Sequence, residues 1–175
     1  AFTSSATNLV AGDTNGVSDV FLRDTQTGTT TRVSISSAAA QANGASTVSD
    51  ISDDGRFVVF SSTATNLVAG DTNAVSDVFV RDTQNNTTIR VSVNGAGAQA
   101  NGASTGGSIS TDGSRVVFTS SATNLIGASD TNGLADVFMR QVSGAPGTSR
   151  ISEGAAGLNA NGASSAGVIS SDGTT

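Results

Sequence analysis

The sequence predicts an all-β protein made of tandem repeats, arranged as the blades of a β-propeller. The first observation behind this prediction is repetition, because Asp13 recurs as Asp71 after 58 residues and as Asp130 after a further 59. The second is that Val, Ile, Phe and Thr gather in short segments bounded by Gly, Asn and Asp, as in strands. The third is that no segment sustains a helical period. Together they predict three four-stranded repeats of about 58 residues.

One repeat contains four short strand segments, described here for the second copy. The segment STVSDIS (46–52) comes first, with counterparts that end at Ile109 and Ile169. The turn DDGR follows, and Asp-Gly between apolar runs favours a hairpin because Gly accepts the positive φ of the turn. The remaining strands are RFVVFSS (56–62), DVFVRD (77–82) and TTIRVSV (87–93).

The repeats form one region over residues 1–175, divided near 1–59, 60–117 and 118–175. The third repeat carries about two extra residues, one in LIGASD (125–130) and one in QVSGAPGTSR (141–150). The opening AFTSS matches the second half of RFVVFSS, and the closing ISSDGTT matches the first half of ISDDGRFVVF. One blade is therefore split between the two ends. A β-trefoil is the main alternative, since it also repeats three times, and a solenoid comes third.

Strands that are apolar on successive residues, such as FVVF, are expected to be covered on both faces. The sequence therefore predicts a core between neighbouring blades. Its members are Phe21, Val58, Phe60, Phe79, Val116, Phe118 and Phe138.

Composition excludes several function classes. The chain has no Cys, His or Lys, and its eight Arg face thirteen Asp and one Glu, for a net charge of −6. A nucleic-acid partner is not expected, because such binding needs clustered cations. No apolar run is long enough to insert into a membrane. A Ser nucleophile would lack its base, and zinc its usual ligands, so we expect no catalytic residues.

A loop rich in Asp and Asn precedes the third strand of each repeat and is the candidate metal site. Its side chains can direct oxygens to one centre, as calcium prefers, while Gly16 allows a sharp bend in the first copy. Asp and Asn also form metal-free turns by bonding nearby backbone amides, and this alternative stays open. The predicted calcium ligands are Asp13, Asn15, Asp19, Asp71, Asn73, Asp77, Asp130, Asn132 and Asp136.

Other polar residues also recur once per repeat. The arginines are expected to pair with Asp24, Asp82 or loop carboxylates, or else to line an anion surface. The Asn-Leu pairs are expected to anchor the long loop, with Leu in the core and Asn on the backbone. These positions are Arg23, Arg81 and Arg140, then Arg32, Arg90 and Arg150, and finally Asn8-Leu9, Asn66-Leu67 and Asn124-Leu125.

The pattern ISDDGRFVVFSS…NLVAGDTN…SDVFVRD…TTIRVS resembles the repeat of TolB-type β-propellers over nearly the whole chain. Its most specific parts are S-x-D-G-R-x-V-x-F and D-V-F-x-R-D. The third repeat departs from it at Gln141, which replaces the second Asp. The resemblance implies a propeller and no single activity, since propellers host many functions.

These observations predict a non-catalytic bacterial module, extracellular or periplasmic, for structural assembly or for binding a protein or ligand. The alternatives are a carbohydrate-binding propeller and a propeller domain of a larger secreted enzyme. Three blades are too few for an ordinary closed propeller. We therefore expect self-association into a ring or filament through complementary ends, or continuation in a longer chain.

Overall fold

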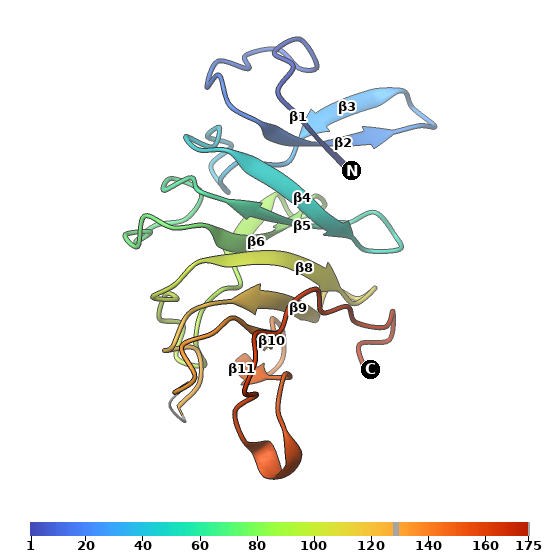
Figure 1. The fold of residues 1–175 in the computed structure, drawn as a ribbon. Helices are drawn as coiled ribbons and strands as arrows, with labels where there is room; N and C mark the ends of the chain where they lie inside the picture. The colour runs from blue at the N-terminus through green and yellow to red at the C-terminus, as the bar shows by residue number, and fades with distance from the viewer. Residues whose placement is uncertain (128–129, 175) are drawn as a thin grey trace.

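The fold is a stack of three antiparallel sheets, described by a computed structural model for residues 1–127 and 130–174 (Figure 1). The first sheet contains β1 (Phe2–Ser4), β2 (Asp19–Asp24) and β3 (Thr29–Arg32). The second contains β4 (Ser46–Ile51), β5 (Phe57–Ser62), β6 (Asp77–Asp82) and β7 (Thr87–Arg90). The third contains β8 (Ser104–Ile109), β9 (Arg115–Ser120), β10 (Asp136–Gln141) and β11 (Gly147–Arg150). A 3₁₀ turn, η1, covers Ala155–Gly157.

Tight turns and the long Asp/Asn loops connect neighbouring strands, so the strands of each sheet lie in sequence order. In the second sheet, Gly55 has a φ of 73°, and the Asp54 carboxylate accepts hydrogen bonds from the Ser52 hydroxyl at 2.6 Å and the Arg56 amide at 3.0 Å. The chain therefore reverses at the predicted Asp-Gly turn, and β5 pairs with β4 on one side and with β6 on the other.

The core lies between the sheets, as the sequence predicts. The second sheet contributes Val58, Phe60 and Phe79 to the layer it shares with the first sheet. Its other face packs against the third sheet through Val59, Val78 and Val80. All seven predicted core residues are at most 1% exposed, so this prediction is confirmed.

The four strands predicted for a repeat are present in the second and third sheets, and the first sheet, at the end of the chain where one blade is predicted to be split, has three. The segment 164–169, expected to form a strand, forms none in the described part of the chain, and Ala166 within it has a φ of 58°. An extended segment becomes a strand only when a neighbour satisfies its backbone groups. The fourth strands also end earlier than predicted, at Arg32, Arg90 and Arg150.

The sheets stack in sequence order, with the N-terminus at one end of the stack and the C-terminal segment at the other (Figure 1). No strand in residues 1–127 and 130–174 pairs with a strand of another sheet. A β-trefoil, whose repeats share one barrel, does not describe this arrangement. Across the same residues no helix has the length and apolar character needed to span a bilayer.

Candidate functional site

The loop before β2 and the end of β3 together form a cluster of charges. Antiparallel pairing places Arg32 opposite Phe21, two residues from Asp19. The Arg32 guanidinium then lies 3.2 Å from the Asp13 carboxylate and 3.3 Å from the Asp19 carboxylate. The side chains of Asp13 and Asp19 are 3% and 0% exposed, so this ion pair is shielded from solvent. We call the two loop carboxylates, the loop Asn and this arginine the Asp–Arg cluster.

The rest of the cluster consists of hydrogen bonds around Asp19. The Ser34 hydroxyl donates to one carboxylate oxygen at 2.6 Å, and the Asn15 side-chain amide donates to the other at 2.9 Å. The Asn15 oxygen accepts the Val17 amide at 3.2 Å, which closes an Asx turn. Gln41 adds a hydrogen bond to Asp13 at 2.9 Å.

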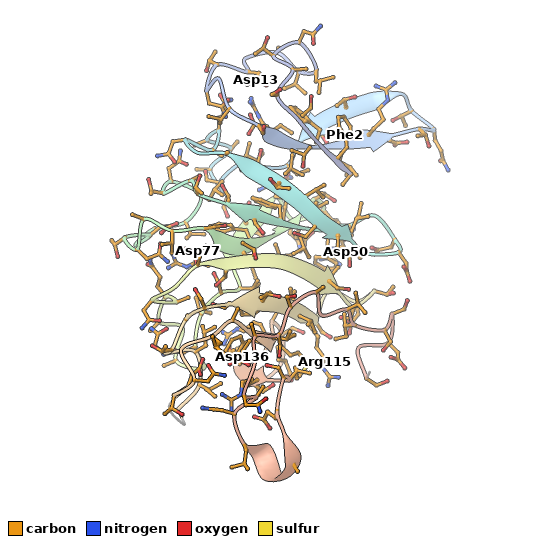
Figure 2. The ribbon with its side chains drawn as sticks, in the orientation of Figure 1. Phe2, Asp13, Asp50, Asp77, Arg115 and Asp136 are labelled. Atoms are coloured by element: carbon orange, nitrogen blue, oxygen red, sulfur yellow. The ribbon has the colours of Figure 1, made fainter. Side chains whose placement is uncertain are left out.

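The second and third repeats build the same cluster. In the second, Arg90 lies 3.3 Å from Asp71 and 3.4 Å from Asp77. In the third, Arg150 lies 4.0 Å from Asp130, a looser pair. Asp13, Asp77 and Asp136, one from each cluster, lie along one side of the stack (Figure 2). All nine predicted ligands belong to these clusters, namely Asp13, Asn15 and Asp19, then Asp71, Asn73 and Asp77, then Asp130, Asn132 and Asp136.

As arranged, the cluster does not accommodate calcium. The arginine supplies the positive charge between the two carboxylates, and Asn15 turns its nitrogen rather than its oxygen toward Asp19. Calcium needs 6–8 oxygen ligands, so the arginine would have to leave. Nowhere in the described part of the chain do three or more His, Cys, Asp or Glu side chains gather as metal ligands. Calcium binding stays a prediction, with arginine as its competitor.

The second cluster leaves several of its buried polar atoms without a hydrogen bond. Burial raises the pKa of Asp71, and the nearby Asp77 carboxylate raises it further, against the opposing effect of Arg90. One Asp71 oxygen and the Gln99 side-chain nitrogen are buried without a hydrogen bond, although their counterparts Asp13 and Gln41 bond each other. The ion pair with Arg90 therefore carries most of the compensation for burying Asp71.

Two arginines, Arg81 of β6 and Arg140 of β10, form hydrogen bonds to the neighbouring sheet. Arg81 donates to the Thr88 hydroxyl at 3.2 Å and to the Ser36 carbonyl of the first sheet's outer turn at 3.4 Å. Arg140 donates likewise to Thr148 at 3.1 Å and to the Asn94 carbonyl at 2.9 Å. Burial lowers the pKa of both guanidinium groups. The partners of Arg81 are hydroxyl and carbonyl oxygens rather than carboxylates. The expected pairing with loop carboxylates is made by Arg32, Arg90 and Arg150.

Asp82 pairs instead with Arg56, a residue of the preceding turn. Two guanidinium nitrogens donate to its two oxygens at 3.0 and 2.7 Å. These bonds, with the backbone amides of Asn85 and Gln84, lower the pKa of Asp82 to about 2. The two-bond geometry fixes the turn after β6 against the turn before β5.

The Asn-Leu anchors form as predicted in two repeats. Leu67 and Leu125 are 2% and 1% exposed. Asn66 bonds the Gln41 carbonyl at 2.8 Å and the Asn43 amide at 3.0 Å, and Asn124 does the same with residues 99 and 101. In the first repeat Leu9 is only half-buried, and the Asn8 side chain forms no hydrogen bond within the described residues.

A groove of about 630 Å³ runs along the inner strands of the stack. Its lining includes Thr47 and Ser49 of β4, Thr105 and Gly106 of β8, and Val168. The lining within the described residues contains hydroxyls, glycine backbone and small apolar groups, and no charged side chain. This groove is the candidate binding surface.

Several cluster residues were not predicted from the sequence. Ser34, Ser92 and Ser152 bond Asp19, Asp77 and Asp136 at 2.5–2.6 Å. Their signal was the recurrence of Arg-Val-Ser or Arg-Ile-Ser at the end of each fourth strand.

No known protein family and no curated protein matches the chain. Among solved structures it is similar to a putative TolB from Agrobacterium tumefaciens, with 18% identity, a TM-score of 0.49, and coverage of 78% of this chain and 42% of that one. It is also similar to TolB from Acinetobacter baumannii, with 20% identity, a TM-score of 0.48, and coverage of 94% of this chain and 32% of that one. The tricorn protease has 17% identity and a TM-score of 0.42, with coverage of 70% of this chain and 11% of that one. The chain therefore spans less than half the length of each of these proteins.

Proposed function

We propose that this chain is a non-catalytic β-propeller module that acts by binding and assembly in an extracellular or periplasmic setting. Three face-to-face antiparallel sheets support the propeller architecture, and the TolB-type sequence pattern supports the setting. Propellers place their inner strands around a central channel, where ligands and partners bind.

The main support for a non-catalytic role is that the recurring charged residues pair with one another or join neighbouring sheets. The loop carboxylates recur in each repeat and face an arginine, and Arg81 and Arg140 hold neighbouring sheets together. A catalytic group must instead be free to touch a substrate. Glu153 is the one charged type that occurs once, and its carboxylate lies 3.9 Å from Arg150 in an exposed turn.

Binding is assigned to the groove beside β4 and β8, the inner strands of the second and third sheets. β4 and β8 are edge strands of their sheets, and edge strands offer backbone groups to an extended peptide. An uncharged lining fits an uncharged partner segment, and the net charge of −6 disfavours a polyanion. The proposed partner is therefore a protein that presents an extended, uncharged segment.

Site-specific photocrosslinking tests this role. A photoreactive residue at Thr105, which is exposed in the groove, should capture a discrete secreted or periplasmic protein. The matched control is Thr27, exposed in the turn between β2 and β3, which should not. Equal labelling from both positions would contradict groove binding. Substrate turnover that disappears when one carboxylate is replaced would contradict a non-catalytic module.

The proposal includes calcium, which would bind the carboxylates of the three loops in place of the arginine that pairs with them. Two carboxylates per loop support an affinity of roughly 10⁻⁴–10⁻³ M, which matches calcium levels outside the cytoplasm. Thermal melting with and without millimolar calcium tests this part. A rise in the melting temperature of the unmodified chain supports calcium, and an unchanged value supports arginine.

A further inference from the structure

We call the hydrogen-bonded contact between two neighbouring sheets a joint, and the two joints of the stack contain the same set of contacts. At the first joint the Thr88 hydroxyl donates to the Ile35 carbonyl at 2.5 Å, beside the bond from Arg81 to Ser36. At the second joint Thr148 donates to the Val93 carbonyl at 2.6 Å, beside the bond from Arg140 to Asn94. Each joint therefore matches a Thr and an Arg of one sheet with the outer turn of the preceding sheet.

The two outer faces of the stack each have one side of such a joint. The first sheet has the Arg and Thr, and the third sheet is followed by the turn that would accept their hydrogen bonds. On the first sheet, Arg23 and Thr30 occupy the positions of Arg81 and Thr88, and within the described residues Arg23 bonds only Thr30, at 2.9 Å. After the third sheet, Glu153 and Gly154 occupy the positions of Val93 and Asn94. That turn keeps its shape, because the Gly157 amide bonds the Gly154 carbonyl as the Gly97 amide bonds Asn94.

A second contact is also divided between the two ends of the stack. Asn43 bonds the Thr65 hydroxyl at 2.9 Å, and Asn101 bonds Thr123 at the same distance. The third copy of this asparagine is Asn161, whose counterpart partners are Thr7 and Asn8 of the first repeat. The side chains of these three residues are exposed and form no hydrogen bond within residues 1–127 and 130–174.

The glycine that follows each of these asparagines packs tightly against the next repeat where the Asn–Thr contact is present, and is open where it is absent. A Cβ on Gly44 would lie 2.7 Å from the Ala64 backbone, and one on Gly102 would lie 2.8 Å from the Ser121 backbone. Gly is required at both positions, since no Cβ tolerates such an approach. A Cβ on Gly162 would meet no atom within 4 Å. Gly162 is therefore a glycine like Gly44 and Gly102, but no backbone segment packs against it.

The apolar surfaces at the two ends match in the same way. Ile151 is 52% exposed, whereas its counterparts Val33 and Val91 are 2% and 1% exposed beneath the next sheet. Ile151 lines a groove of about 310 Å³ with Val137, Met139 and Val168. At the other end Phe2 is half-buried, whereas its counterparts in the later sheets are buried.

The segment 164–169 already lies where the inner strand of a further sheet belongs. The Ser164 amide bonds the Ala135 carbonyl at 2.7 Å, as Ser46 bonds Ser18 and Ser104 bonds Ser76. Within the sheets, the Ser46 hydroxyl bonds that of Ser62 at 2.9 Å. In the same register, the position opposite Ser164 corresponds to Ser4, which lies on the free edge of β1.

We propose that a second copy of this chain occupies these surfaces, so that two copies exchange segment 164–169 and close a ring of six sheets. Segment 164–169 of each copy completes the sheet of β1, β2 and β3 in its partner. Propellers commonly have about 4–8 blades, and six is the only multiple of three in that range. The inference rests on the proposed propeller module, and it names a second copy as a partner.

Solution mass and one substitution test the closure. The chain should have twice its own mass of 17.1 kDa by multi-angle light scattering. Gly162→Leu should leave the circular dichroism spectrum unchanged, because the site is open within one copy, and should weaken the dimer at least about tenfold by steric exclusion. The control Gly102→Leu should unfold the chain instead. A single-chain mass, an open series of larger species, or a dimer that survives Gly162→Leu would overturn the proposal.

A cysteine pair tests the register, in a chain that has no other Cys. Ser4→Cys with Ser164→Cys should form intermolecular disulfides on mild oxidation, because side chains directly opposite in a ladder come close enough. The control pair, Ser4→Cys with Ser165→Cys, should not, since successive side chains point to opposite faces. Equal crosslinking by both pairs would overturn the register. Failure of the ring leaves capture at Thr105 unaffected, so failure of the proposed function is detected separately.

Discussion

Arg90 is the residue on which the second Asp–Arg cluster depends. Its side chain is 9% exposed and lies between two carboxylates that are 3% and 0% exposed. Removing one partner from a buried pair leaves an uncompensated charge. Arg90→Gln should therefore lower the free energy of unfolding by about 3–5 kcal/mol in urea denaturation at neutral pH.

The control for this prediction is Arg23→Gln, which alters an exposed arginine and should change stability by less than about 0.5 kcal/mol. Calcium gives a further readout, because two carboxylates without an arginine form a better cation site. Millimolar calcium should restore part of the stability lost in Arg90→Gln. A cost below about 1 kcal/mol would show that Arg90 does not hold the cluster.

The Asp82–Arg56 pair should make stability depend on acid pH. The pKa of Asp82 falls from 3.8 to about 2 on folding, so its contribution is complete above 3.8 and is lost as the pH falls toward 2. Because Arg56 is 34% exposed, solvent screening limits the effect to about 1 kcal/mol. Asp82→Asn should destabilise the chain at pH 7 and much less at pH 2. The control is Asp24→Asn, whose exposed carboxylate accepts hydrogen bonds from Gln26 and Thr27 and, within the described residues, none from an arginine.

Ala74 occupies a position that favours glycine. Its φ is 56°, whereas the first and third loops have Gly16 and Gly133 at φ values of 69° and 65°. A Cβ in this left-handed region costs about 1–2 kcal/mol, partly offset by the greater freedom of an unfolded glycine. Ala74→Gly should raise the free energy of unfolding by about 0.5–1 kcal/mol, and Gly16→Ala should lower it. A loss of stability in Ala74→Gly would contradict the backbone argument.

The candidate ligands could be predicted from spacing alone, but their partner could not. Repetition of Asp, Asn and Asp locates three loops, and the structure places all nine side chains in the Asp–Arg clusters of those loops. Whether arginine or calcium faces them depends on strand register, which places Arg32 opposite Phe21. Register comes from pairing across the sheet, so the local sequence does not reveal it.

At the scale of elements, stability comes from stacked strands that are apolar on both faces. Phe60 and Phe79 pair across β5 and β6, with ring centroids 5.6 Å apart, and both are fully buried. Phe60→Ala should cost about 3–5 kcal/mol in urea denaturation. Phe60→Leu keeps most of the volume and should cost less than about 1.5 kcal/mol. Similar values for the two variants would mean that the cavity is not the cause.

Most elements could be predicted because short apolar runs, Asp-Gly turns and Asx loops are local signals. The segment 164–169 shows where local signals fail. Its sequence matches β4 and β8, yet it forms no strand within the described residues. Strand propensity reflects the fit to a neighbouring surface, and the neighbour that matches this segment lies at the other end of the stack.

At the scale of the whole molecule, each sheet is supported by the sheets on either side. The middle sheet is covered on both faces, and all six residues of β6 are buried. Only the first half of β2 is buried, and the third sheet leaves Ile151 exposed. Stability in such a stack is approximately a sum of sheet and interface terms. The two outer sheets should therefore open more readily than the middle one.

Amide hydrogen exchange measures this difference and links it to association. At concentrations low enough to favour single copies, amides in β5 and β6 should exchange most slowly, while those in β1 and β11 exchange faster. At high concentration the added joint should slow exchange in the outer sheets and in segment 164–169, because those amides gain partners. The middle sheet serves as the internal control, since its two joints are complete in a single copy. Exchange that is uniform across the three sheets and independent of concentration would show that the outer faces stay open to solvent.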